Sequence, residues 1–139
     1  MYEIGNFKII QNDIEVEEIS IDQNNIGNFK LNFILPTKNI LNSKLIVILV
    51  SVAEDRVLIL HDESYENDFD GKEYASFILS MNNTLFLGEG LYNLIACSVP
   101  LDAFKVDEGI SVKEIIDSYS QIFRVVRAVN NDILKKGSK

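Results

Sequence analysis

The chain has 139 residues and a mass of 15.8 kDa, which suits one domain with a continuous core, and 47% of its residues are apolar, which excludes a disordered acidic tail. It carries 21 acidic and 13 basic residues, a formal net charge of −8, so nucleic acid and anionic membrane surfaces are disfavoured as partners. No apolar run reaches the roughly 18–20 residues that span a bilayer, and the N-terminus shows no secretory signal, so no membrane insertion is expected.

Short apolar segments separated by polar turns predict β-strands along the first hundred residues. The clearest is Phe29–Leu35, where every second residue is apolar, as a half-buried strand requires. Ser43–Val52 is apolar on both faces and indicates a central strand, although a buried helix of this length has the same pattern. The other expected strands are Glu3–Ile10, Asp13–Ile21, Val57–His61, Tyr74–Met81 and Leu91–Val99.

A glycine-rich corner joins the last two of these strands. Residues 85–92 read Leu-Phe-Leu-Gly-Glu-Gly-Leu-Tyr, and a second apolar segment begins at once. Gly88 and Gly90 can adopt a positive φ without a steric clash, so the chain can reverse sharply between two strands. The spacing of strands and turns predicts a single all-β domain over residues 1–139, an antiparallel β-sandwich.

The C-terminal part fits two interpretations. Ser111–Glu114 has a capping-box pattern, and apolar residues keep a helical period from Val112 to Val126, which favours one long helix. The β-branched residues of Ile122–Val129 favour a strand instead. We favour a short helical turn over Val112–Tyr119, a final strand over Ile122–Val129, and a frayed tail over Asn130–Lys139.

A terminal strand left at an exposed edge would invite pairing with another chain. Exchange of Ile122–Val129 between two protomers would cover that edge and bury Phe123 and Val125, so we expect a homodimer through the C-terminal strand.

Catalytic residue sets are hard to assemble from this composition. Cys97 is the single cysteine and lies in an apolar segment, which favours a small buried side chain and, weakly, a cytoplasmic location. His61 is the only histidine, and no Gly-x-Ser-x-Gly elbow supplies a nucleophile. The acidic segment His61–Glu73 resembles the first half of an EF-hand calcium loop. The last position of such a loop requires a bidentate acidic residue, and this position is Phe77, which cannot bind calcium. We interpret it as a solvated hairpin loop, with irregular calcium coordination as the alternative, and expect no enzyme and no cofactor.

Several segments, taken together, resemble a known family. They are Phe29–Leu35, Leu45–Ser64, Phe77–Leu79, Leu85–Ser98 and Ile116–Val126. In this order they are similar to the C-terminal carbohydrate-binding domain of the ATPase subunit of O-antigen ABC exporters. The resemblance covers about residues 29–126 and implies an immunoglobulin-like or jelly-roll sandwich, often dimeric, that binds a polysaccharide at the cytoplasmic face of the membrane. It further implies an exporter ATPase or membrane subunit as a partner, although this chain has no ATPase domain.

The corner motif, the strand count and the missing catalytic sets predict a non-catalytic glycan-binding domain. The resemblance implies that its ligand is a cell-surface polysaccharide bound for export. For the site we expect at least one of Tyr65, Tyr74 and Tyr92 to stack on a sugar ring, assisted by His61 and Asn93. The alternative function is a small acidic interaction protein, from a phage or mobile element, that binds and inhibits a host protein. A minor hydrolase is a third possibility, for which no single pair of carboxylates stands out.

Overall fold

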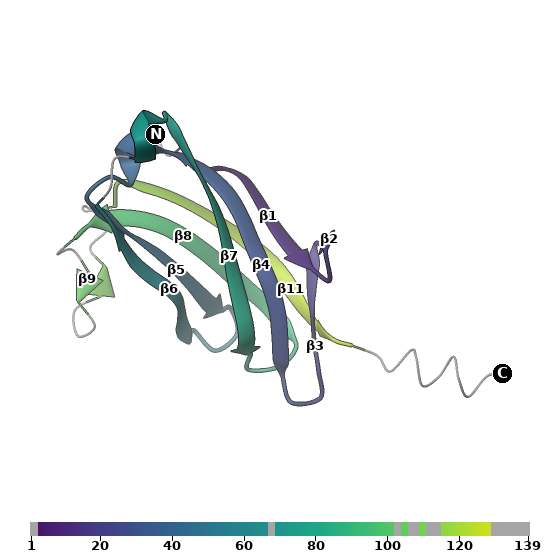
Figure 1. Cartoon of the computed structure of the whole chain (residues 1–139). Coiled ribbons are helices and arrows are strands. Elements are labelled where there is room, and N and C mark those ends of the chain that lie inside the picture. The colour runs from purple at the N-terminus through teal and green to yellow at the C-terminus, as the bar shows by residue number, and fades with distance from the viewer. Residues whose placement is uncertain (1–2, 67–68, 102–103, 106–108, 111–114, 129–139) are drawn as a thin grey trace.

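In the computed structural model, which describes residues 3–66, 69–101, 104–105, 109–110 and 115–128, two β-sheets pack face to face (Figure 1). The strands are β1 Gly5–Gln11, β2 Ile14–Glu15, β3 Glu18–Ile21, β4 Ile26–Pro36, β5 Ser43–Ser51, β6 Val57–Tyr65, β7 Tyr74–Leu85, β8 Gly90–Pro100, β9 Phe104–Lys105, β10 Gly109–Ile110 and β11 Asp117–Arg127. Two single turns of 3₁₀ helix, η1 Thr37–Asn39 and η2 Phe69–Gly71, interrupt the connections.

One sheet has the strand order β2-β1-β4-β7 and the other has the order β3-β11-β8-β5-β6. A separate hairpin pairs β9 with β10. The described strands pair antiparallel except for β3 and β11, which run parallel. The predicted all-β sandwich is therefore confirmed. Among the described residues, no helix has the length and apolar character needed to cross a membrane.

The core lies between the sheets and follows the predicted alternation. The four alternate apolar residues of the segment Phe29–Leu35 are at most 3% exposed. They belong to one buried cluster with Leu45, Val47 and Leu49 of β5. The Phe7 ring stacks on Phe33 and on Tyr119 of the opposite sheet, and so helps to join the two layers.

The predicted strand Asp13–Ile21 is wrong as a single element. Positive φ angles at Asn12 and Asp13 turn the chain after β1, and β2 pairs only with β1. The chain then crosses to the other sheet, where β3 pairs with β11. The Gln11 side chain clamps this crossing, because its amide donates to the Ser20 carbonyl and accepts from the Ser20 N–H. A half-buried amide of this kind leaves no periodic signal in the sequence.

The prediction that Ser43–Val52 is a central strand is confirmed. Its counterpart β5 lies between β8 and β6, with one face in the core. On the outer face Ile46 is buried together with Cys97 and Val99, and Ile115 packs against them. The chain after β8 therefore returns over one end of the outer face.

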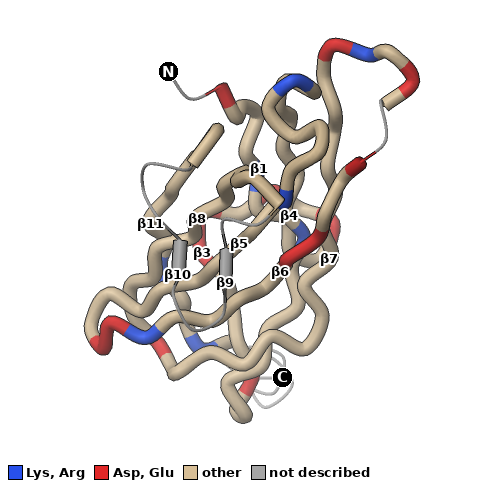
Figure 2. Tube along the Cα trace, turned by 90° about the vertical axis from the view of Figure 1, so that its left-hand side faces the viewer, with Lys and Arg blue, Asp and Glu red and all other residues tan. Residues whose placement is uncertain are grey.

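The interpretation of residues 61–73 as a hairpin loop is wrong. β6 continues to Tyr65 within the five-stranded sheet, and the next strand, β7, belongs to the other sheet. The segment is thus a crossing between the two layers. Its acidic residues begin on β6, the edge strand, where the trace turns red in Figure 2.

The C-terminal strand is confirmed and begins earlier than predicted, since β11 spans Asp117–Arg127. The long-helix interpretation is wrong, and so is the described part of the predicted helical turn, because Asp117–Tyr119 are extended. Residues 111–114 and the predicted tail, residues 130–139, lie outside the described residues.

The prediction of strand exchange assumed that the C-terminal strand lies at an exposed edge of its sheet, and this assumption is wrong. β11 pairs with β8 over residues 117–125 and with β3 over residues 124–127, so it is an inner strand.

The glycine corner between β7 and β8 is confirmed. Gly88 and Gly90 have φ angles of 133° and 143°, which L-residues with side chains rarely adopt. The Tyr92 hydroxyl holds the corner, since it accepts from the Leu87 N–H at 3.1 Å and donates to the Gly88 carbonyl at 2.7 Å.

The two ends of the sandwich differ in character. The upper end in Figure 1 contains η1, η2 and the first described residues. The lower end contains the β7–β8 corner and the β3–β4 turn.

Candidate functional site

The five predicted site residues do not form one site. His61 and Tyr65 lie together on β6, whereas Tyr74 begins β7 at the upper end. Tyr92 lies in the core near the lower end, and Asn93 lies on the opposite face of β8, towards the outside.

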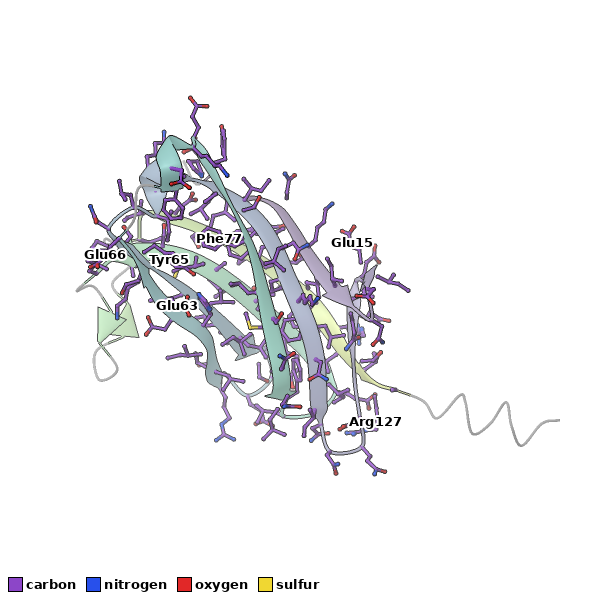
Figure 3. The ribbon with its side chains drawn as sticks, viewed as in Figure 1. Glu15, Glu63, Tyr65, Glu66, Phe77 and Arg127 are labelled. Carbon is purple, nitrogen blue, oxygen red and sulfur yellow. The ribbon has the colours of Figure 1, made fainter. Side chains whose placement is uncertain are left out.

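On β6, alternate side chains form a small polar cluster. The Tyr65 hydroxyl donates to Glu63 Oε2 at 3.2 Å and lies 3.2 Å from His61 Nε2, and the His61 and Glu63 side chains are 3.8 Å apart. The Tyr65 ring meets Phe77 of β7 edge-to-face at 5.2 Å, and these two side chains are labelled in Figure 3. The Tyr65 ring also stacks on Phe69, with ring centroids 6.3 Å apart. Because Phe77 and Phe69 pack against the Tyr65 ring, this ring contributes to the contact between the two sheets and is not free to stack on a sugar.

Burial governs the protonation of this cluster. It lowers the pKa of His61, although the carboxylates of Glu63 and Asp62 act in the opposite direction. The Glu63 side chain is 64% exposed, so water screens its attraction. Burial, reinforced by Glu63, raises the pKa of Tyr65 well above its ordinary value. At neutral pH the cluster therefore holds a neutral imidazole and a protonated phenol, which serve for hydrogen bonding.

The lowered pKa of His61 predicts a loss of stability in mild acid. The unfolded chain binds a proton near pH 6.5, whereas the folded chain binds it only at lower pH, so stability present above pH 6.5 falls as the pH drops towards the folded pKa. We expect wild type to lose more free energy of unfolding between pH 7.5 and 5.5 than His61→Gln does. An NMR titration of this single histidine should show a midpoint below 6.5, and a midpoint at or above 6.5 would contradict the assignment.

Tyr92 cannot present a ring face to a sugar, which corrects the prediction for this residue. It is 3% exposed, its ring lies 5.4 Å from that of Phe86 and 6.1 Å from that of Phe123, and its hydroxyl is used within the corner. Burial also raises the pKa of its hydroxyl.

Tyr74, by contrast, is 60% exposed and borders a depression at the upper end. This upper-end depression has a volume of about 300 Å³ and is lined by Glu3, Pro36, Thr37, Lys38, Glu73 and Tyr74. It combines one aromatic ring with a cation, two carboxylates and a hydroxyl. The Lys38 amine lies 3.6 Å from the Glu3 carboxylate, and the Thr37 hydroxyl donates to the Lys72 carbonyl at 2.7 Å.

A buried carboxylate that the sequence reasoning missed supports the depression from below. Asp117 is 0% exposed, and its Oδ1 accepts from the N–H groups of Glu3, Ile4 and Ser118. Its Oδ2 accepts from Asn39 Nδ2 at 2.9 Å, and the same amide donates to Glu3. Asp117 thus ties the start of the described chain, η1 and β11 together. The sequence signal for Asp117 is a charged residue at an inward position of a strand, but the helical period of Val112–Val126 hides it.

A second, larger cavity lies at the lower end, with a volume of about 450 Å³. Its walls are mostly apolar and come from β5, β6 and the β7–β8 corner, with Asn25, Ser51 and Arg56 as its polar residues. It holds none of the predicted residues except Tyr92.

The described residues offer neither a cluster of metal ligands nor a reactive thiol. No group of three or more histidine, cysteine, aspartate or glutamate side chains there is arranged to hold a metal ion. Cys97 is buried, and burial raises the pKa of its thiol to about 11, so it is a protonated core side chain at neutral pH.

Comparisons of the chain with family models, with curated proteins and with solved structures found no match. The resemblance to the exporter domain therefore stays a prediction.

Proposed function

We propose that the chain is a non-catalytic carbohydrate-binding domain and that the upper-end depression is its binding site. The observation that carries the proposal is the exposed ring of Tyr74 beside the hydrogen-bonding side chains of Thr37, Lys38 and Glu73. A sugar presents a CH face that stacks on an aromatic ring, and its hydroxyls need both donors and acceptors. The depression offers all of these in one place.

Hydrogen bonds and strand pairing anchor the backbone around the depression. Asp117 fixes Asn39 and the backbone of Glu3, and Pro36 and Tyr74 face each other across the β4–β7 ladder. Little ordering would be required on binding, so a small contact suffices for a dissociation constant on the order of micromolar to millimolar. Export of a polysaccharide, with an ABC transporter as partner, stays a prediction from the resemblance.

Replacement of Tyr74 by alanine tests this proposal. We expect Tyr74→Ala to weaken binding of glycans, identified first on an array, by about tenfold, because the stacking surface is lost. Tyr74→Phe keeps that surface and should bind within about twofold of wild type. The measurement is calorimetric titration, with NMR chemical shifts to locate the contact.

Ile78→Ala supplies the matched control, since Ile78 is also exposed and lies four residues further along the same face of β7. It should bind like wild type. Equal affinity of Tyr74→Ala and wild type would move the site elsewhere. Absence of binding to any glycan, together with a stable protein partner in a pull-down, would favour the interaction-protein alternative.

A further inference from the structure

The lower-end cavity opens where the two sheets are not joined. β6 and β7 are edge strands of opposite sheets. Towards the upper end the Tyr65 and Phe77 rings close the gap between these strands, with centroids 5.2 Å apart. Towards the lower end Leu58 of β6 pairs directly with Leu49 of β5, so both side chains point to the core face of the sheet. Leu49 is 3% exposed but Leu58 is 41% exposed, so the core is open to solvent at this edge.

The cavity has an apolar floor and an apolar rim. The floor consists of buried side chains that are at most 3% exposed: Leu49, Phe86 and Tyr92. The rim consists of exposed leucines: Leu58, Leu85 and Leu87. The volume of about 450 Å³ falls within the roughly 300–1,000 Å³ typical of small-molecule sites. An aliphatic chain on this floor would also cover the three leucines, and the burial of that apolar area favours binding.

The polar side chains that line the cavity offer hydrogen-bond donors. Asn25 Oδ1 accepts from Arg127 Nη2 at 2.7 Å, which fixes the amide and leaves its Nδ2 without an acceptor among the described residues. The Ser51 hydroxyl accepts from the Glu54 N–H at 3.3 Å and donates to no described residue. Arg56 adds the N–H groups of its guanidinium. A ligand that completes these hydrogen bonds must supply acceptor atoms.

The lining is positively charged, although the chain as a whole carries −8. None of the described residues that line the cavity is an aspartate or a glutamate, and Arg56 is the cation among them. Arg56 is exposed and forms no ion pair with any described residue, including Glu54 and Asp55 of the same turn. A guanidinium presents paired N–H donors in the geometry of a carboxylate. One cation also matches the single charge of a carboxylate, whereas a phosphate monoester carries nearly two charges at pH 7.

We propose that the lower-end cavity is a second binding site, for a ligand with an aliphatic chain and a carboxylate head, such as a medium-chain fatty acid. The chain lies on the apolar floor, and the carboxylate lies at the β5–β6 turn, where Arg56 binds it. Because the Arg56 side chain has no other ionic partner among the described residues, no existing ion pair has to break. The cavity is at the opposite end of the sandwich from the upper-end depression, so this binding and glycan binding are independent.

Calorimetric titration of the full chain with octanoate, kept below the concentration at which it forms micelles, tests the proposal. Octanoate should bind saturably, with one molecule per chain. Octanol keeps the aliphatic chain but lacks the charge, so it should bind about tenfold more weakly. Acetate keeps the charge but lacks the chain, so it should show no measurable binding.

Two variants and a control assign the binding to the cavity. Arg56→Gln should weaken octanoate binding about tenfold and leave octanol binding within about twofold of wild type. Arg124→Gln is the matched control, since Arg124 is an exposed arginine on β11 that does not line the cavity, and it should bind octanoate like wild type. Leu58→Trp fills the mouth of the cavity and should abolish binding of both ligands. Circular dichroism confirms that each variant is folded.

NMR chemical shifts locate the ligand. Octanoate should shift the amide signals of Leu49, Phe86 and Tyr92 and leave that of Tyr74 unchanged. Absence of saturable octanoate binding would overturn the proposal, and so would binding that Arg56→Gln and Leu58→Trp both leave unchanged. Equal affinity for octanol and octanoate would also overturn it, because the carboxylate would then not be recognised. A dimer in sedimentation equilibrium that Leu58→Trp disrupts, without octanoate binding, would assign the cavity to a second copy of the chain instead.

Discussion

Replacement of Asp117 by alanine is expected to lower the free energy of unfolding by about 3 kcal/mol, measured by urea denaturation at pH 7. The carboxylate is fully buried and accepts four hydrogen bonds, three from backbone N–H groups and one from Asn39. Alanine would leave these donors without an acceptor, while removal of a buried charge offsets part of the loss. The start of the described chain at Glu3 and Ile4 should also become more accessible to proteases.

Asp117→Asn is the matched variant. Its amide oxygen still accepts the three backbone N–H groups, but its amino group faces Asn39 Nδ2, which is also a donor. We therefore expect a loss of about 1 kcal/mol. An Asp117→Ala protein within about 0.5 kcal/mol of wild type would show that the network contributes little to stability.

Removal of the Tyr92 side chain should cost about 4 kcal/mol, because Tyr92→Ala opens a cavity beside Phe86 and Phe123 and releases the glycine corner. Tyr92→Phe keeps the ring and loses only the hydrogen bonds to Leu87 and Gly88, so it should cost about 1–1.5 kcal/mol. Both losses in the free energy of unfolding are to be measured by denaturant unfolding, and we expect the m-values to equal that of wild type.

Tyr74→Phe is the control for Tyr92→Phe, since Tyr74 is exposed and has no such role in a turn. Its stability should lie within about 0.5 kcal/mol of wild type. If the two phenylalanine variants were equally stable, the Tyr92 hydroxyl would not be what holds the corner.

The strands with a clear period could be predicted from the sequence, because alternation records which face is buried. Phe29–Leu35 and the doubly apolar β5 are examples, and so is the glycine corner, where backbone conformation limits the residue type. The division of Asp13–Ile21 into two strands was missed, since the turn before β2 depends on left-handed Asn12 and Asp13, and the crossing from β2 to β3 depends on the Gln11 side chain. The start of β11 was missed because its apolar spacing suits a helix equally well.

The site was predicted less completely than the fold. Residue type alone favoured all three tyrosines, but exposure, which depends on tertiary packing, separates Tyr74 from Tyr65 and Tyr92. Asp117 was missed for the same reason, since it acquires its role from segments far away in the chain.

The place of β11 has a consequence for how the protein is made. This strand is near the end of the chain, yet it lies between β8 and β3 and forms the parallel pair with a segment about a hundred residues earlier. On the ribosome, β3 has no neighbour in its own sheet until β11 has left the exit tunnel. Such long-range pairing folds slowly. β3 and one edge of β8 therefore remain without their partner strand until β11 has been synthesised.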